Sequence, residues 1–179
     1  MVQEIFWFSS DHGTVTRKDI EETSRLSEDF FETQGDPSQV ATSPENKAFI
    51  FSSLQKYLNI IKKEDRVIGY AFVLPSTKET MNAFLEERIT EAEVFERVHH
   101  LDLTLDPEAL YLCAAVIDKN YRGQGLATQA FEKLLEKLTS HLKIKPFLYA
   151  WIYSEDGKRI FEARKSYLER AGFLIYMRS

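Results

Sequence analysis

The stretch Arg122-Gly123-Gln124-Gly125-Leu126-Ala127 (RGQGLA) lies between an apolar run, Leu110 to Ile117, and a segment with apolar residues at helical spacing. The apolar run predicts a buried strand, and the later segment predicts a helix. Two glycines without β-carbons let the backbone approach an anion closely, and the first turn of a helix presents N–H groups at the positive end of its dipole. The stretch therefore predicts a loop that holds a diphosphate.

Composition places the chain among globular proteins. Its 179 residues are 44% hydrophobic and 13% aromatic, which is enough for the core of one domain over residues 1–179. The net charge of −5, without clusters of Lys and Arg, disfavours a nucleic-acid partner. Cys113 is the only cysteine and lies in the apolar run, so the sequence excludes an intramolecular disulfide and predicts no metal site.

Targeting and membrane signals are not found in the sequence. The start, Met-Val-Gln-Glu-Ile-Phe-Trp-Phe, has no basic region, and no apolar segment approaches the length that crosses a bilayer. We therefore expect no membrane association and a cytoplasmic location.

Local signals predict the elements before the apolar run. Thr16 and Asp19 stand at capping spacing, and Ser43-Pro44 suits a helix start. Two stretches rich in β-branched and aromatic residues flank a short polar turn and predict an antiparallel hairpin. The expected elements are a strand over 4–9, a helix from Thr16 that ends before Gly35, a helix from Ser43, and hairpin strands over 58–62 and 67–74.

Residues 76–100 predict a helical insertion before the apolar run. Ser76 with Glu79 and Thr90 with Glu93 have the spacing of capping boxes. The insertion contains six Glu against three Lys and Arg, a net charge of −3 that would attract a cationic amine. The alternative is that these charges only solvate the helix faces.

The elements beyond the loop continue the alternation of helix and strand. Apolar residues recur at helical spacing up to Leu142, and Pro146 to Tyr153 predicts another buried strand. A strand, a loop, a helix and a strand in this order require a right-handed parallel crossover. A last helix over about 156–171 is expected to end at Gly172, and residues 173–177 predict a final strand.

This order of elements, with the pattern Arg-x-x-Gly-x-Ala after a hydrophobic strand, resembles the GNAT superfamily of acyl-CoA-dependent N-acetyltransferases. The resemblance implies an α/β (α+β) fold: a GNAT-like central mixed β-sheet flanked by helices, with the 76–100 insertion before the coenzyme A-binding strand. It also implies that acetyl-CoA is the cosubstrate. The acetyl group would pass directly to a primary amine of a small-molecule or peptide acceptor.

The resemblance assigns coenzyme A to two segments. The strand before the loop would bind the pantetheine arm through freed backbone groups, as an added strand would. The loop and the first turn of the helix would bind the pyrophosphate through N–H groups, with a threonine hydroxyl as a further donor. The implied residues are Ala115, Val116 and Ile117 for the arm, and Arg122, Gly123, Gln124, Gly125, Leu126, Ala127 and Thr128 for the pyrophosphate.

A general acid is expected in the last helix. Members of the superfamily often have a tyrosine four residues before a Gly-Phe pair, where its hydroxyl can protonate the departing thiolate. Leu168 occupies that position before Gly172-Phe173, and Tyr167 is adjacent. One residue turns a helix by about 100 degrees. Tyr167 is therefore either the acid, in a shifted helix register, or a packing residue.

The general base has several candidates. Glu108 comes just before the apolar run, where some histone acetyltransferases of the superfamily have a glutamate. Ala109 holds the matching register, however, and one residue changes the face of a strand. Cys113 has apolar neighbours, so we expect a raised pKa and no nucleophilic role. The alternatives to Glu108 are Glu155, Asp156, His99 and His100.

Two departures from the superfamily pattern lead to further expectations. The chain stops at Ser179 without the seventh strand that members commonly have. We therefore expect a homodimer to cover the exposed sheet edge, unless the insertion covers it within one chain. The missing tyrosine leaves two alternatives to an enzyme: a non-catalytic coenzyme A-binding module, or an interaction protein.

Overall fold

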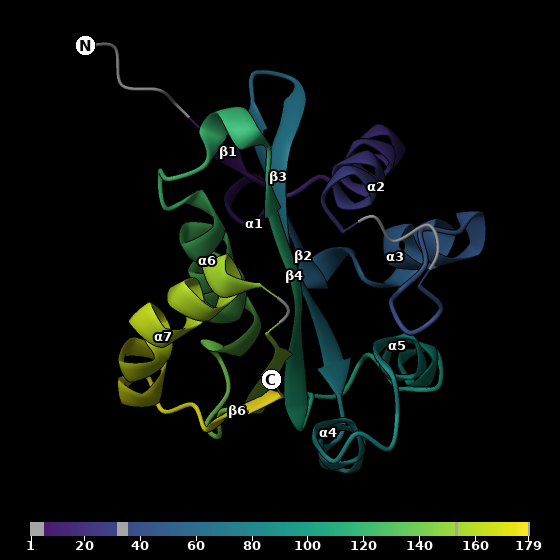
Figure 1. The fold of residues 1–179 in the computed structure, drawn as a ribbon, viewed down its shortest axis with the longest axis vertical. Coiled ribbons are helices and arrows are strands. Elements are labelled where there is room, and N and C mark those ends of the chain that lie inside the picture. The colour runs from purple at the N-terminus through teal and green to yellow at the C-terminus, as the bar shows by residue number, and fades with distance from the viewer. Residues whose placement is uncertain (1–5, 32–35, 153, 179) are drawn as a thin grey trace. The chain divides into compact units, whose positions relative to one another are not determined.

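The computed structural model describes residues 6–31, 36–152 and 154–178, and it confirms the expected α/β fold (Figure 1). Six strands form one mixed sheet in the order β1-β2-β3-β4-β5-β6. The first three are antiparallel neighbours, whereas β4, β5 and β6 run parallel. The strands are β1 (Trp7–Phe8), β2 (Leu58–Lys63), β3 (Arg66–Ser76), β4 (Ala109–Ile117), β5 (Phe147–Trp151) and β6 (Ile175–Arg178).

The chain divides into two compact units. The described residues of 1–36, 41–72 and 114–140 form the first unit, and those of 37–40, 73–113 and 141–179 form the second. Strands β3 and β4 contribute residues to both. The helices of the first unit are α1 (Ser9–His12), α2 (Arg17–Phe31), α3 (Pro44–Ser53) and α6 (Leu126–Thr139), with short turns η2 (Gln55–Tyr57) and η3 (Lys119–Tyr121).

Local capping signals in the first unit were predicted correctly. Thr16 and Asp19 bond each other's backbone N–H groups at 2.9 and 3.2 Å, just before α2. Ser43 caps α3 by accepting the Asn46 N–H. The predicted hairpin is also confirmed, since β2 pairs with β3 from Leu58↔Phe72 to Lys63↔Arg66.

The predicted first strand is shorter than expected. Only Trp7 and Phe8 are extended, and Glu4 and Ile5 lie outside the described residues. The chain turns into α1 at Ser9, whose Oγ accepts the Ile60 N–H at 2.8 Å, while the Asn59 side chain accepts the Ser10 N–H at 3.0 Å. In these two hydrogen bonds a side chain bonds to the backbone, whereas a longer β1 would pair with β2 through backbone groups alone.

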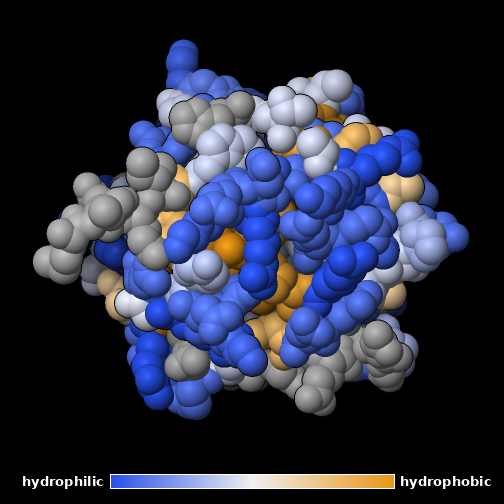
Figure 2. Space-filling model, turned by 90° about the horizontal axis from the view of Figure 1, so that it is seen from above, coloured by the Kyte–Doolittle hydropathy of each residue, from blue (hydrophilic) through white to orange (hydrophobic). Residues whose placement is uncertain are grey.

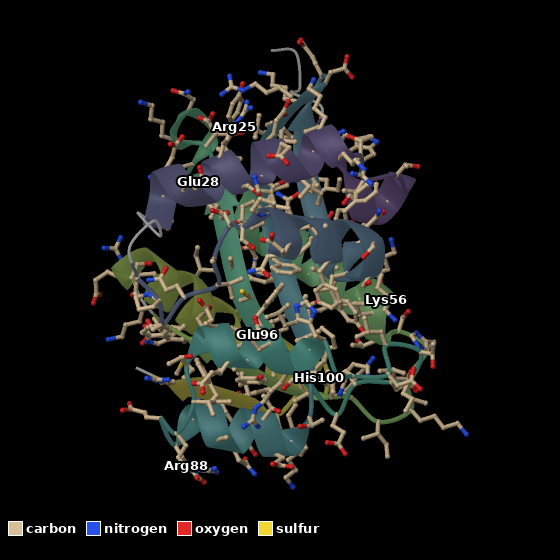
Figure 3. The ribbon with its side chains drawn as sticks, turned by 90° about the vertical axis from the view of Figure 1, so that its right-hand side faces the viewer. Arg25, Glu28, Lys56, Arg88, Glu96 and His100 are labelled. Atoms are coloured by element: carbon tan, nitrogen blue, oxygen red, sulfur yellow. The ribbon has the colours of Figure 1, made fainter. Side chains whose placement is uncertain are left out.

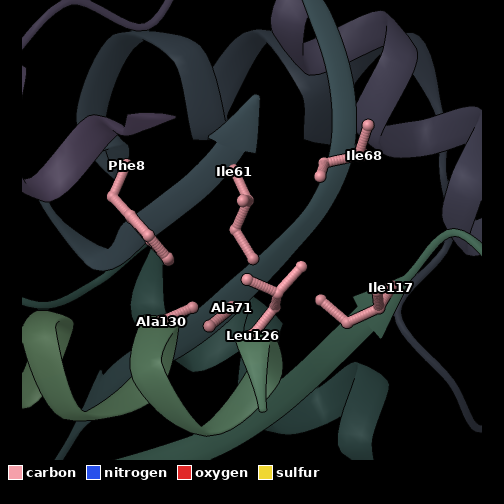
Figure 4. Close-up of a cluster of buried hydrophobic side chains, with 7 residues drawn as sticks. All are labelled: Phe8, Ile61, Ile68, Ala71, Ile117, Leu126 and Ala130. Atoms are coloured by element: carbon pink, nitrogen blue, oxygen red, sulfur yellow. The ribbon is translucent and has the colours of Figure 1, made fainter. Parts of the chain in front are cut away.

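A hydrophobic cluster places α6 on the β2–β3 hairpin of the first unit (Figure 4). Leu126 and Ala130, one turn apart on α6, are buried in it together with residues of the strands. The Asn59 Nδ2 donates to the Ala130 carbonyl at 2.9 Å, which adds a polar link between β2 and α6. The start of α6, and with it the loop before it, is therefore fixed to the hairpin. The cluster consists of Phe8, Ile61, Ile68, Ala71, Ile117, Leu126 and Ala130.

The second unit contains the predicted insertion as two helices, α4 (Lys78–Leu85) and α5 (Glu91–Val98), together with α7 (Glu155–Arg170). The capping box of Thr90 and Glu93 is confirmed. The one expected at Ser76 is wrong: Thr77 caps α4, and Ser76 stays in β3, where its hydroxyl accepts a hydrogen bond from Tyr149 at 2.8 Å.

The parallel ladder between β4 and β5 is short. Among the described residues it runs from Ala109↔Phe147 to Tyr111↔Tyr149, although β4 continues to Ile117. This pairing with β5 therefore involves only the first three residues of β4. None of the helices in the described ranges has the length and apolar character of a membrane span.

Candidate active site

The glycine loop of the first unit has the backbone of an anion cradle. Gly123 and Gly125 have φ of 78° and 72°, in the left-handed region that glycine adopts without strain. Gly125 is the N-cap of α6. An added β-carbon would meet nothing within 4 Å at Gly123 and only Gln129 Nε2, at 3.9 Å, at Gly125. The first N–H groups of α6 have no carbonyl partner within the helix, so they can serve an anion.

Asp118 anchors the chain just before the loop. Its carboxylate caps η3 by accepting the Asn120 N–H at 2.9 Å, and it forms a 2.7 Å ion pair with Arg66. The Asp118 N–H donates to the Ile68 carbonyl at 2.8 Å. The path of the chain from β4 into the loop is thus fixed to β3.

The side chain of Arg122 also stabilises the loop. Its Nε donates to the Ile117 carbonyl at 3.0 Å, and its guanidinium lies 5.2 Å from the Phe30 ring centroid on α2. Arg122 therefore shapes the loop through its side chain. Figure 2 shows the molecule from above, where most of the coloured surface is hydrophilic and hydrophobic residues are visible near the middle of the face.

Gly69 is a residue that sequence reasoning missed. A β-carbon there would lie 2.8 Å from the Val116 carbonyl oxygen and 2.6 Å from the Ile117 Cδ1, closer than such atoms approach. The predicted pantetheine strand thus contacts the β3 backbone directly. Ala115 is half-buried, whereas Val116 and Ile117 are buried. No sequence pattern indicates this contact, because Gly69 and Val116 are far apart in the chain.

A polar cluster in the second unit centres on Glu91, the first residue of α5. Its Oε1 accepts the Tyr111 hydroxyl at 2.8 Å and the Cys113 thiol at 3.8 Å, and its Oε2 accepts the Val40 N–H at 3.4 Å. Burial, reinforced by the Glu91 charge, raises the pKa of both Tyr111 and Cys113 well above their usual values. The thiol is therefore protonated at neutral pH, as expected, and it is a poor nucleophile.

Aromatic rings hold Tyr111 in place. Its ring centroid lies 5.1 Å from that of Phe84 and 5.0 Å from that of Tyr149, and the side chains of all three are buried. Burial also raises the pKa of Tyr149, whose hydroxyl donates to Ser76. The Tyr111 hydroxyl therefore has a fixed direction toward Glu91.

The predicted acid, Tyr167, lies in α7 with 47% of its surface exposed. Leu168, at the superfamily's tyrosine position, is buried instead. The helix ends as expected: Gly172 has φ 92°, and the Phe173 N–H donates to the Leu168 carbonyl at 3.1 Å. The phenol is accessible at the surface of the second unit, and its catalytic role stays a prediction.

Glu108 has a structural contact. Its exposed carboxylate accepts the Lys78 N–H at 2.9 Å, at the first residue of α4, where an acceptor stabilises a helix start. Its role as general base stays a prediction. His99, His100 and Glu155 are also exposed. The side chain of Asp156 lies outside those that the structure describes.

The described ranges, 6–31, 36–152 and 154–178, contain no group of three or more His, Cys, Asp or Glu side chains that could hold a metal ion. Coenzyme A, in contrast, has a fitting feature in the first unit, because the glycine loop leaves open space beside N–H groups at the start of α6.

Comparisons with known proteins identify the family and agree with the fold. The model of the acetyltransferase (GNAT) family matches residues 20–173. The structure is similar to that of a diaminobutyrate acetyltransferase from Paenibacillus lautus in complex with L-2,4-diaminobutyric acid and coenzyme A, with a TM-score of 0.54, 14% identity, and coverage of 94% of this chain and 76% of that one. An N-acetyltransferase from Staphylococcus aureus gives a TM-score of 0.51, 12% identity, and coverage of 90% and 82%. At these identities the likeness concerns the fold alone. No curated protein matches the sequence significantly.

Proposed function

Because the chain belongs to the acetyltransferase (GNAT) family and is therefore an acyl-CoA N-acyltransferase, we propose that it transfers an acetyl group from acetyl-CoA directly to a primary amine. The observation that carries the proposal is the glycine loop, with two left-handed glycines at the start of α6. The acceptor is a small molecule or a peptide, and the reaction takes place in the cytoplasm, within one domain over residues 1–179.

Two segments bind the cosubstrate in this proposal. The N–H groups of residues 122–127 and the Thr128 hydroxyl hold the pyrophosphate. The backbone of Ala115, Val116 and Ile117 holds the pantetheine arm as an added strand. The short β4–β5 ladder supports this, because paired strands would leave no backbone groups for the arm.

The protein contributes mainly by positioning the amine and the thioester, and no covalent acyl-enzyme intermediate is formed. Backbone N–H groups of β4 polarise the thioester carbonyl, and the bound amine attacks its carbon directly. The C–N bond forms as the C–S bond breaks, Glu108 accepts the proton that the amine nitrogen loses, and Tyr167 protonates the departing thiolate. Cys113 takes no part as a nucleophile, since its thiol is protonated.

Turnover of acetyl-CoA with a panel of amines tests this function. The panel contains amino acids, diamines including L-2,4-diaminobutyric acid, polyamines and peptides with free N-termini. We expect release of free coenzyme A thiol with at least one class, together with an acetylated product by mass spectrometry. Binding of coenzyme A without any turnover would favour the non-catalytic module instead. Failure to bind coenzyme A would favour the interaction protein.

A homodimer is a further part of the proposal. Strand β6 lies at the edge of the sheet, and 60% of Leu174, 40% of Tyr176 and 45% of Met177 is exposed. The insertion contacts β6 at Arg178, whose Nε lies 3.7 Å from the Glu87 carboxylate and whose Nη1 donates to the Ile89 carbonyl at 3.4 Å. The insertion nevertheless leaves the side chains of Leu174, Tyr176 and Met177 exposed. A symmetric partner would cover them and pair the edge.

Light scattering at micromolar protein should give twice the mass of one chain. Met177→Lys places a charge at the proposed contact and should give the mass of one chain, with a circular dichroism spectrum that shows the variant is still folded. A monomer mass for the unaltered protein would reject the dimer.

A further inference from the structure

Residues 117–122, which we call the anchor turn, precede the glycine loop and are closed by hydrogen bonds. One oxygen of the Asp118 carboxylate accepts both the N–H and the side-chain Nδ2 of Asn120, at 2.9 and 3.0 Å. The Arg122 Nε donates to the Ile117 carbonyl at 3.0 Å, which joins the two ends of the turn. The conformation of the anchor turn is therefore fixed by contacts of its own side chains.

The tip of the β2–β3 hairpin contacts the anchor turn with two cations. Lys63 and Arg66 pair with each other on either side of the hairpin turn. The Arg66 guanidinium forms the 2.7 Å ion pair with Asp118, whose side chain is only 8% exposed. The Lys63 ammonium lies 5.2 Å from the centroid of the Tyr121 ring. The Asp118 carboxylate thus bonds to the anchor turn with one oxygen and to the hairpin with the other.

The glycine loop lies between two fixed ends. The anchor turn ends at Arg122, and α6 is fixed to the hairpin by the hydrophobic cluster and by the bond from Asn59 to the Ala130 carbonyl. Residues 123–125 connect these two ends, and all of them belong to the first unit. Glycine has the largest conformational freedom and no side chain that could restrict it. The order of the loop must therefore come from its ends.

We propose that Asp118 is a positioning residue of the coenzyme A site: paired with Arg66, it keeps the glycine loop in the conformation that binds the diphosphate. Asp118 acts through the anchor turn rather than by contact with the cosubstrate, because its negative charge would repel the phosphates. The inference rests on the proposed function and deepens it, since it extends the determinants of cosubstrate affinity from residues 122–128 to the tip of the hairpin.

Asp118→Ala should weaken cosubstrate binding and leave the chemical step unchanged. A glycine loop without its anchor samples other conformations, and the apparent affinity falls with the fraction of molecules in the binding conformation. The Kd for coenzyme A and the KM for acetyl-CoA should both rise by about fivefold to thirtyfold, the range for loss of a capping side chain. The kcat at saturating acetyl-CoA should equal that of the wild type.

Two further variants separate the cap from the ion pair. Asp118→Asn keeps an oxygen that can accept the Asn120 N–H and loses the charge, so its Kd should rise less than that of Asp118→Ala. Arg66→Ala keeps the cap, and because Arg66 is 67% exposed its ion pair is screened, so the Kd should rise by only about twofold. Arg25→Ala, on the exposed surface of α2, controls for loss of an arginine and should bind as the wild type does (Figure 3).

Asp19 provides a matched control for the loss of a buried carboxylate. Its side chain is 3% exposed, accepts the Thr16 N–H at the start of α2, and forms a 2.7 Å ion pair with a hairpin cation, Lys62. Asp19→Ala therefore removes the same kinds of contact in the same unit, but at α2 instead of the anchor turn. Its melting temperature should fall, and its Kd for coenzyme A should stay at the wild-type value. Equal losses of affinity in the two alanine variants would overturn the inference.

A truncated donor tests whether Asp118 acts through the diphosphate. S-acetylpantetheine contains the thioester and the pantetheine arm without the diphosphate, so it does not use the glycine loop. Asp118→Ala should lower kcat/KM for acetyl-CoA by the factor given above and leave kcat/KM for S-acetylpantetheine unchanged. A general structural role would lower both values equally, and that result would also contradict the inference.

The outcomes distinguish this inference from the proposed function. If the wild type acetylates amines and a folded Asp118→Ala variant has the wild-type Kd for coenzyme A, the inference is wrong and the function stands. If the wild type binds coenzyme A and acetylates no amine, the function is wrong, and the Kd values of the variants alone decide the inference. If the wild type does not bind coenzyme A, both are overturned. Thermal melting monitors folding, and Asp118→Asn replaces Asp118→Ala if that variant is unfolded.

Discussion

Gly125→Glu is expected to abolish coenzyme A binding in a protein that still folds. Gly125 has φ 72° and caps α6, and a β-carbon there meets only the end of the Gln129 side chain, at 3.9 Å. The left-handed conformation would cost a glutamate about 1–2 kcal/mol, which a folded domain can tolerate. Its carboxylate, however, would occupy the N-terminal end of α6, where the phosphates should bind. We expect the Kd for coenzyme A to rise at least about 100-fold, or about 2.7 kcal/mol.

Gly13→Glu is the control for backbone strain and added charge. Gly13 also has a positive φ, 101°, and open space around its Cα, but it follows α1 rather than preceding α6. Calorimetry should give this variant the affinity of the wild type. An unchanged affinity in folded Gly125→Glu would remove the loop from the proposed binding site.

Tyr167→Phe is expected to lower kcat by about tenfold to ten-thousandfold, the range for loss of a general acid, with almost unchanged affinity for acetyl-CoA. The phenol is 47% exposed, so the substitution removes a hydroxyl without creating a cavity. The two steady-state constants and a separate binding measurement test this expectation.

Tyr176→Phe controls for the loss of an exposed tyrosine hydroxyl, since Tyr176 is 40% exposed on β6. It should turn over at the wild-type rate. Equal rates for the wild type and Tyr167→Phe would leave solvent as the proton source for the thiolate.

The parts of the fold that depend on neighbouring residues could be predicted from the sequence. The capping box at Thr90, the Ser43 cap and the hairpin turn each involve residues a few positions apart. The errors arise where a distant residue intervenes. Ser76 lies in β3, where Tyr149 donates to its hydroxyl, and Thr77 caps α4 instead. The first strand ends at Phe8, and the Asn59 side chain accepts the Ser10 N–H in the turn that follows.

The candidate site likewise contains one part that could be predicted from neighbouring residues and one part that could not. The glycine loop is a continuous stretch, so its left-handed glycines and the helix after it follow from the sequence. The position of Glu91 depends on Tyr111, twenty residues later, and on Val40, which precedes it by about fifty. Nothing in the sequence separates Glu91 from the five other glutamates of the insertion, because only the fold turns its side chain toward β4.

The protonated state of Cys113 has a practical consequence for measuring the reaction. Disulfide reagents that detect coenzyme A react with thiolates, and Cys113 is the only cysteine of the chain. Because its raised pKa keeps it in the thiol form, the enzyme itself should consume such a reagent slowly at neutral pH. Colour development in a turnover assay would then report the product rather than the catalyst, and the wild-type chain can be used without first replacing its cysteine.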